Sequence, residues 1–319
     1  MTSSQHTLRA HQFAGLGGGG TRLIVLGAVH GNETCGTRAI ERVLAELDAG
    51  ALHIERGLLT LVPVANPLAY VKGQRQGQRN LNRHLQPTPQ PTEFEDHVAN
   101  VLCPWLAAHD VLLDLHSFAG PGRPFVMRGP ADNDAALEPF GHAAAEGRLA
   151  DHLGPTRIVE GWMAAYAQGA VRRRALGLTD DADPSYGVGT TEYMRSRGGY
   201  GVTLECGQHT DPAAPEVGYR AIRQAIALLG LADDTLTPPA PEFERLRLTE
   251  VVDRRHEGDR FVREWCSFDA VHAGEHVGER ADGTAVIARS DGHIVFPDAG
   301  ALPGHEWFYF AQASEPEPA

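Results

Sequence analysis

The chain alternates between short apolar runs and segments in which apolar residues recur every three or four positions. The runs, such as the one at residues 22–27, are rich in leucine, isoleucine and valine and predict buried strands. The recurring pattern at Ile40, Val43, Leu44 and Leu47 predicts an amphipathic helix. By the same criteria, further strands are expected at residues 58–64, 111–116, 124–127 and 201–205, and further helices at 93–108, 134–149, 162–176 and 213–231.

Strands that alternate with helices predict an α/β fold, in which helices pack against a sheet. In such sheets, ligands bind at the carboxyl ends of the strands. Four polar residues lie at or just after predicted strand ends, namely His30, Asn66, His116 and Glu205. We therefore expect the functional site at that edge of the sheet.

The pattern changes after a proline-rich segment at residues 235–242. Beyond it, short alternating stretches are broken by Gly and Asp, which predicts a small β-rich domain with hairpin turns. We expect a catalytic domain at residues 1–235, the β domain at 243–313 and an acidic tail at 314–319. The turn rhythm is similar to that of biotinyl or lipoyl barrel-sandwich domains. Because Lys72 is the only lysine of the chain, we expect a lid or wall rather than a cofactor carrier.

Composition and charge narrow the function classes. The net charge is −13, from 28 Lys+Arg against 41 Asp+Glu. This disfavours nucleic-acid partners, because nonspecific binding to them depends on cationic contacts to phosphate. No apolar stretch approaches the roughly 18–20 residues that cross a bilayer, and the first residues lack the apolar core of a signal peptide. We expect a cytoplasmic protein without a membrane partner. The four cysteines are scattered, which predicts free thiols.

Three residues form a candidate zinc site. His30 and Glu33 lie three residues apart in a loop that opens a helix, and His116 ends an apolar strand. Zinc hydrolases commonly use a His₂Glu ligand set and leave a fourth position for water. A His-x-x-Glu pair alone is more often a helix-surface feature, but the joint placement at strand ends favours a metal site. Glu205 also ends an apolar strand, where an unpaired carboxylate is costly to bury, so it is a candidate general base.

A long polar stretch at residues 66–91 supplies cations, with Arg75, Arg79 and Arg83 in it. A loop of this length inside a compact domain is usually functional or disordered. Arginine binds carboxylates through two parallel hydrogen bonds, so the stretch predicts a site for an anionic substrate. A solvated basic loop is the alternative.

Five motifs occur along the chain in one order: GAVHGNE at 27–33, NP at 66–67, NLNR at 80–83, DLH at 114–116 and TLECG at 203–207. In this combination the chain resembles the succinylglutamate desuccinylase/aspartoacylase family, a branch of the zinc carboxypeptidase-like fold, over residues 20–235. The C-terminal β domain also resembles the family's extra domain. The resemblance implies a mixed sheet flanked by helices, a small barrel-sandwich-like domain after it, and one Zn²⁺ per chain.

The resemblance also implies roles for individual residues. The zinc ligands of the family match His30, Glu33 and His116, and its catalytic glutamate matches Glu205. Arg75 matches the arginine that polarises the scissile carbonyl. Implied substrate contacts are the carboxylate-binding pair Asn82 and Arg83, a second carboxylate-binding arginine at Arg195, and a C-terminal tyrosine at Tyr309.

The chain departs from the family pattern at several positions. Thr191 stands where aspartoacylase uses a tyrosine, and residues 172–174 and 180–189 have no family counterpart. We therefore expect a substrate pocket that differs from that of a true aspartoacylase.

The expected activity is zinc-dependent hydrolysis of the amide of a small N-acyl amino acid or a related compound that bears a carboxylate. Two alternatives are a metallocarboxypeptidase that acts on peptides and a noncatalytic binding protein that retains the fold. The sequence leaves a homo-oligomer open.

Overall fold

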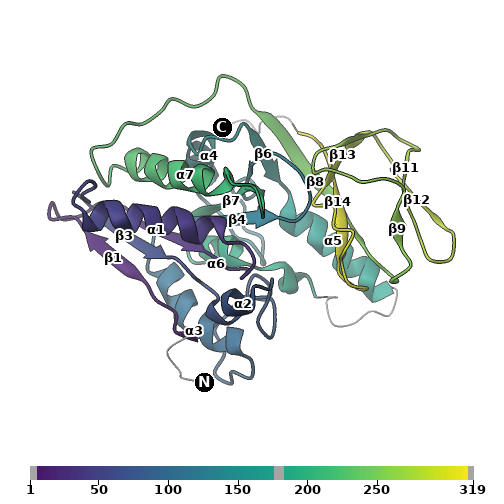
Figure 1. The fold of residues 1–319 in the computed structure, drawn as a ribbon, viewed down its shortest axis with the longest axis horizontal. Helices are drawn as coiled ribbons and strands as arrows, with labels where there is room; N and C mark the ends of the chain where they lie inside the picture. The colour runs from purple at the N-terminus through teal and green to yellow at the C-terminus, as the bar shows by residue number, and fades with distance from the viewer. Residues whose placement is uncertain (1–5, 176–182, 315–319) are drawn as a thin grey trace.

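The computed structural model describes residues 6–175 and 183–314, arranged as Figure 1 shows. A mixed sheet of eleven strands runs through this part of the chain. In spatial order its strands are β1 (His11–Ala14), β3 (Leu58–Val62), β2 (Arg22–Gly27), β4 (Val111–Phe118), β7 (Tyr200–Gln208), β5 (Phe125–Met127), β6 (Arg157–Glu160), β8 (Glu244–Asp253), β14 (Glu306–Ala313), β13 (Gly292–Val295) and β10 (Ala270–Val271). The predicted α/β fold with a β-rich C-terminal region is confirmed.

Helices cover both faces of the sheet. They are α1 (Cys35–Asp48), α2 (Pro67–Lys72), α3 (Phe94–Ala107), α4 (Ala143–His152), α5 (Trp162–Ala175), α6 (Thr190–Ser196) and α7 (Ala214–Leu228), with a short 3-10 helix η2 (Pro184–Gly187). Successive strand residues point to opposite faces. Leu23 and Val25 of β2 therefore join the core under α1, α4 and α7, whereas Ile24 and Leu26 join the core against α3 and α6. Apolar residues in consecutive positions of β2 serve both cores.

The parallel strands β3, β2, β4 and β7 form the part of the sheet that positions the site. The register places Gly27 of β2 beside Leu115 of β4, and His116 of β4 beside Glu205 of β7. Because these strands run in the same direction, their carboxyl ends meet at one edge of the sheet. The polar residues expected at that edge lie there.

One predicted helix begins later than expected. The pattern at residues 134–149 predicts a helix, but α4 begins at Ala143. Pro139 disfavours helical backbone in the residue before it. A bridge between Asn133 and Phe140 holds the segment before α4 in a closed loop instead.

Several short elements have no clear sequence signal and were not predicted, namely β1, β6, α2 and α6. They are four to seven residues long, so periodicity has too few positions to register in them. Residue 176, the expected end of α5, lies outside the described residues.

The proline-rich segment at residues 235–242 joins the two expected domains without interrupting the sheet. It belongs to the connection from α7 to β8, which arches over the fold in Figure 1. β8 pairs in parallel with β6 and antiparallel with β14, so the C-terminal strands extend the same sheet. A second sheet consists of β12 (Ala285–Ile287), β11 (His276–Glu279) and β9 (Arg260–Phe261). The expected boundary thus separates two parts that share one sheet. Residues 315–319 of the expected tail lie outside the described residues.

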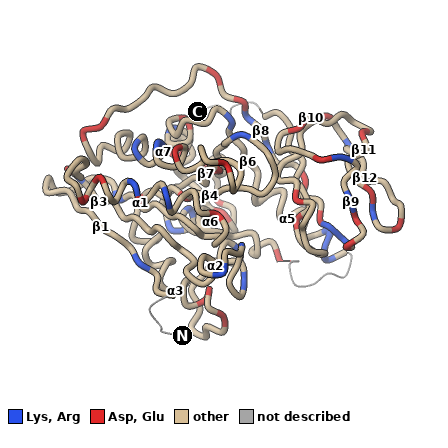
Figure 2. The backbone as a smooth tube through the Cα atoms, viewed as in Figure 1, with Lys and Arg blue, Asp and Glu red and all other residues tan. Residues whose placement is uncertain are grey.

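Acidic and basic residues are interspersed along the backbone rather than gathered into blocks of one sign (Figure 2). Many arginines pair with carboxylates distant in sequence, such as Arg22 with Asp110 and Arg173 with Asp253. Within the described residues, none of the helices has the length and apolar character to cross a membrane.

Candidate metal centre

The three predicted zinc ligands converge in the structure. His30 and Glu33 lie in the loop between β2 and α1, and His116 lies on the neighbouring strand β4. Glu33 Oε1 is 2.9 Å from His30 Nδ1, and Glu33 Oε2 is 2.9 Å from His116 Nδ1. All three side chains are buried, and one ligand atom from each lies within 4.8 Å of the others. This group could hold a metal ion.

The Nε2 atom on the far side of each imidazole lies close to a side-chain oxygen. His30 Nε2 lies 3.1 Å from Asn80 Oδ1, and His116 Nε2 lies 3.0 Å from Asp114 Oδ2. The Nδ1 atom of each ring faces the Glu33 carboxylate, so two ring nitrogens and a carboxylate converge on one point. Two nitrogen lone pairs and a carboxylate that converge in a buried site fit a divalent cation, and this donor set suits zinc.

The charges of the three candidate ligands shift one another's pKa values. Burial lowers the pKa of His30 to about 4, helped by the positive charge of Arg75. Burial would raise the pKa of Glu33, but His30 and His116 lower it well below its usual range. Burial would also lower the pKa of His116, but the carboxylates of Asp114 and Glu33 raise it. In the metal-free protein these shifts favour an ionised Glu33 between a neutral His30 and a protonated His116.

Asp114 gives the first prediction. Changing Asp114 to Asn should weaken zinc binding about 10–100-fold, because the amide holds the His116 ring less firmly than a carboxylate does. A competitive titration against a zinc-binding dye measures this. Asp110→Asn is the matched control, since Asp110 pairs with Arg22 on the surface. Unchanged zinc affinity in Asp114→Asn would contradict the orienting role.

Glu205 lies beside the ligands on β7, next to His116 in the β4–β7 register. Its side chain is buried, and its Oε2 atom has no hydrogen-bond partner among the described residues. Burial raises the pKa of Glu205 to about 8. Glu205 lines the same cavity of about 550 Å³ as His30, Glu33 and His116. Once ionised, the Glu205 carboxylate at the cavity wall is suited to accept a proton from a ligand there, and its raised pKa makes it a stronger base.

The raised pKa of Glu205 predicts a pH-dependent stability of the metal-free protein. An exposed Glu titrates near 4.5, so from about pH 4.5 to about pH 8 the folded state keeps a proton that the unfolded state has released. The free energy of unfolding of the wild type should therefore fall as pH rises through this window. Glu205→Gln lacks this titration, so its stability advantage should grow with pH. Urea denaturation of chelator-treated proteins at pH 5, 6.5 and 8 measures it, and a constant difference would contradict the assignment.

Arg75 reaches the metal centre from the loop after α2. Its Nη1 atom donates to Glu33 Oε1 at 3.1 Å and lies 3.3 Å from His30 Nδ1. The side chain is about half exposed, at 49%. Arg75 therefore places a positive charge at the rim of the ligand set, where a carbonyl oxygen could accept a hydrogen bond from it.

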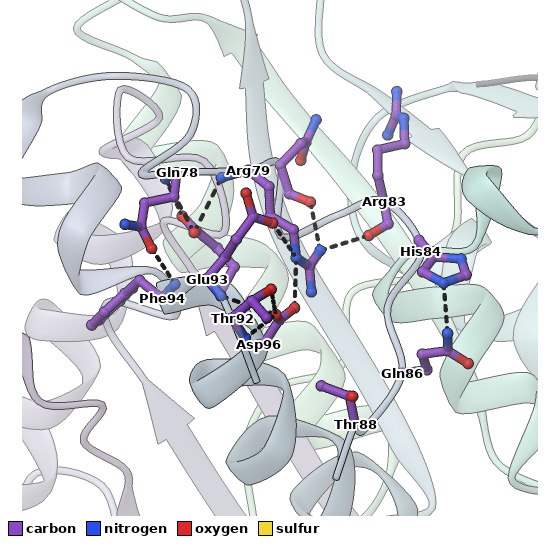
Figure 3. A network of polar contacts seen from close by, with 12 residues as sticks. Gln78, Arg79, Arg83, His84, Gln86, Thr88, Thr92, Glu93, Phe94 and Asp96 are labelled. Atoms are coloured by element: carbon purple, nitrogen blue, oxygen red, sulfur yellow. Dashed lines mark hydrogen bonds and ion pairs between the residues drawn. The ribbon is translucent and has the colours of Figure 1, made fainter. Parts of the chain in front are cut away.

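The loop that carries Arg75 is tied to the start of α3, as Figure 3 shows. Glu95 accepts hydrogen bonds from the backbone N–H groups of Gly77, Gln78 and Arg79. The Arg79 guanidinium donates to Asp96 at 2.9 Å and to the backbone oxygen of Arg83 at 3.0 Å. These contacts fix the backbone of residues 77–79 and favour a built site over a solvated basic loop there, while residues 71–76 are exposed.

Asn82 and Arg83 also line the cavity. Asn82 Oδ1 accepts from the Thr190 N–H at 2.9 Å. The buried Arg83 guanidinium donates to Glu306 of β14 at 3.1 Å and lies over the Trp162 ring at 4.9 Å. Burial would raise the pKa of Glu306, but the charge of Arg83 lowers it to about 2. The C-terminal part of the chain therefore orients Arg83 at the cavity wall.

Arg195 lines the cavity, but its hydrogen-bonding capacity is used by the protein. Its five N–H groups are directed at Glu146, Glu138, Glu192 and the backbone oxygen of Gly201. A substrate carboxylate could bind Arg195 only by displacing one of these partners. The substrate contact implied for Arg195 by the family stays a prediction.

Tyr309 of β14 lies at the cavity wall, as expected from the resemblance. Its side chain is buried and its hydroxyl has no hydrogen-bond partner among the described residues. Burial raises the pKa of this hydroxyl well above its usual value. Tyr309 thus lines the cavity with a neutral hydroxyl whose oxygen is itself buried.

Three site residues received no role from sequence reasoning: Asn80, Asp114 and Glu306. Asn80 and Asp114 belong to motifs that carry the family resemblance. Each lies two positions before a predicted site residue, Asn82 or His116, and this spacing could have identified them. Glu306 had no such signal, because its partner Arg83 lies 223 positions away in sequence.

Comparison with known proteins relates part of the sequence to one family and the fold to solved structures. A sequence model of the succinylglutamate desuccinylase/aspartoacylase catalytic domain matches residues 19–126. No curated protein matches the sequence significantly. Among solved structures, the succinylglutamate desuccinylase/aspartoacylase from Rhodobacter sphaeroides is 18% identical with a TM-score of 0.70, and the alignment covers 96% of this chain and 90% of that chain.

Two further solved structures give similar values. The product-bound ectoine utilization protein EutE (DoeB) from Ruegeria pomeroyi is 20% identical with a TM-score of 0.67, over 92% of this chain and 86% of that chain. An aspartoacylase family protein from Mesorhizobium loti is 18% identical with a TM-score of 0.66, over 97% and 90%. At these identities the structures establish the fold. The resemblance to the succinylglutamate desuccinylase/aspartoacylase family is therefore confirmed, in sequence over residues 19–126 and in fold over nearly the whole chain.

Proposed function

We propose that this chain is a zinc-dependent amidohydrolase that cleaves the amide of a small N-acyl amino acid or a related compound with a carboxylate. The family match supports a hydrolase. The observation that carries the proposal is the buried group of His30, Glu33 and His116, which shares one cavity with the unpartnered carboxyl of Glu205. Zinc held by the three ligands would lower the pKa of a bound water and polarise the carbonyl.

The protein's own groups supply the remaining steps. Glu205 accepts a proton from the attacking water and later transfers it to the nitrogen of the leaving amine, so that the amide and water become a carboxylate and an amine. Arg75 donates a hydrogen bond to the carbonyl oxygen as it gains negative charge. Asn82 and Arg83 hold the substrate carboxylate, which fixes the amide in the orientation for attack.

The size of the cavity favours a small substrate over a peptide. Its volume of about 550 Å³ is within the range of pockets for small molecules. The C-terminal part of the chain forms one wall, with Phe296, Pro297, Glu306 and Tyr309 among its residues. A wall at this place limits the length of chain that can extend from the scissile amide, which disfavours the metallocarboxypeptidase alternative. The complete set of ligands, base and arginines disfavours the noncatalytic alternative.

The decisive experiment is amine release by the zinc-loaded protein from a panel of N-acyl amino acids and short peptides, with Glu205→Gln as the control. Hydrolysis of small acylated amino acids, lost in the control, would support the proposal. Cleavage confined to peptides would move the assignment to a carboxypeptidase. No turnover on any member of the panel would overturn the proposed substrate class.

A further inference from the structure

Thr190 reaches the metal centre only through other residues. It is the first residue of α6, and its hydroxyl donates a hydrogen bond to Asp114 Oδ2 at 2.5 Å. The same oxygen lies 3.0 Å from Nε2 of the candidate ligand His116. Thr190 is 1% exposed and does not line the cavity. Any effect of its hydroxyl on a bound metal ion therefore passes through Asp114.

The Asp114 carboxylate depends on this hydroxyl for its orientation. Asp114 is fully buried, and its Oδ1 atom has no hydrogen-bond partner among the described residues. The terminal torsion of an aspartate side chain has only a broad, twofold preference, so the side chain alone does not fix the plane of the carboxylate. The hydrogen bond from Thr190 to Oδ2 fixes it. Thr190 therefore determines how Asp114 meets the His116 ring.

The backbone of Thr190 is held as well as its hydroxyl. Its N–H donates to Asn82 Oδ1 at 2.9 Å. Gly189 permits this approach, because a Cβ atom at that position would overlap the Asn82 amide. Since both ends of the contact are fixed, the Thr190 hydroxyl is presented to Asp114 in one place.

Asn82 extends the same series of contacts to the other imidazole. Its N–H donates to Asn80 Oδ1 at 2.9 Å, and that oxygen lies 3.1 Å from His30 Nε2. One continuous series of contacts thus joins His116, Asp114, Thr190, Asn82, Asn80 and His30. The outer contacts of the two candidate imidazole ligands meet at Thr190, and outer contacts of this kind orient the ligands of a metal.

We propose that Thr190 is a positioning residue of the metal centre, which orients the ligand His116 by holding Asp114. The inference rests on the proposed function in taking His116 as a zinc ligand. It gives Thr190 no contact with the metal ion or with a substrate.

The test is the zinc affinity of Thr190→Val. Valine has nearly the same shape and keeps the backbone N–H that binds Asn82, but it lacks the hydroxyl that binds Asp114. In competition with a zinc-binding dye, the dissociation constant for zinc should rise about 5–10-fold, somewhat less than the 10–100-fold typical of losing a direct outer partner of a ligand. Thr190→Ser keeps the hydroxyl and should bind zinc almost as tightly as the wild type.

Thr60→Val is the matched control. Thr60 is also a buried threonine whose hydroxyl contacts a side chain, His109 Nε2 at 2.7 Å, but it does not line the cavity. This variant should lose stability and keep the zinc affinity of the wild type, and urea denaturation measures the stability that each variant has lost. An equal loss of zinc affinity in Thr60→Val would show general destabilisation and overturn the inference.

A double variant tests the route through Asp114. Residues of one network are not additive, so adding Thr190→Val to Asp114→Asn should change the zinc affinity much less than Thr190→Val changes that of the wild type. Full additivity would overturn the inference, because Thr190 would then act on zinc by another route.

Zinc affinity also separates this inference from the proposed reaction. A wild type that binds zinc but hydrolyses no member of the substrate panel, with weaker zinc binding in Thr190→Val, would support the inference while the reaction fails. Unchanged zinc affinity in Thr190→Val would overturn the inference and leave the reaction in place. A wild type that binds no zinc would overturn both.

Discussion

Replacing Glu205 with glutamine is expected to remove most turnover while zinc stays bound. Glutamine has nearly the same size, but it cannot accept the proton of the attacking water or return it to the leaving amine. General acid–base catalysis by a positioned group typically contributes about 10²–10⁴-fold, so kcat should fall by that factor. Steady-state amine release by the zinc-loaded protein, on the best substrate of the panel, measures the effect.

Zinc content is the internal control for this variant. Glu205 is not one of the three converging ligands, so elemental analysis should find the same zinc per chain in Glu205→Gln as in the wild type. Wild-type kcat in the zinc-replete variant would rule out Glu205 as the proton carrier. Loss of zinc together with activity would show that Glu205 acts in metal binding instead.

His116→Ala is expected to lose the metal itself. The substitution removes one of three ligands and leaves Glu33 with a single imidazole partner, His30. The loss of zinc affinity should exceed the 10–100-fold typical of losing a residue that only orients a ligand. After dialysis against a weak chelator, the variant should contain almost no zinc and show no hydrolysis. Elemental analysis and the dye titration measure this.

His109→Ala provides the matched control for His116→Ala. His109 is also a buried histidine, but it bonds to Thr60 Oγ1 at 2.7 Å and to the Trp105 backbone oxygen at 2.6 Å, away from the cavity. Its replacement should lower stability and keep zinc at the wild-type level. Stoichiometric zinc in His116→Ala after dialysis would exclude His116 from the ligand set.

The core strands and the position of the site were predictable because they depend on local pattern. The apolar run of β2 is continuous because helices cover both faces of the strand, and the predicted bounds of β2 agree with the structure. His30, His116 and Glu205 follow or end such runs, and parallel strands bring their carboxyl ends together. The family motifs then predicted which of these residues would form a metal-ligand set.

The start of α4 was not predictable from periodicity alone. The first part of the predicted helix at residues 134–149 has helical spacing. In the structure this part is a loop, closed by the bridge between Asn133 and Phe140, and it contains Pro139. Short elements such as β6 could not be predicted for a different reason. A strand of four residues has too few positions to show a periodic pattern.

The α/β fold, the edge of the sheet that carries the candidate site, and the residue types that gather there therefore follow from local sequence pattern. The tertiary structure decided which charges remain available to a ligand. Arg195 meets Glu146 and Glu138 from 49 and 57 positions away, and Arg83 meets Glu306 from 223 positions away. Periodicity records which face of an element is buried, whereas the pairing of a buried charge depends on how distant segments pack. For that reason the sequence alone could not show that the donors of Arg195, a predicted substrate contact, are all used within the protein.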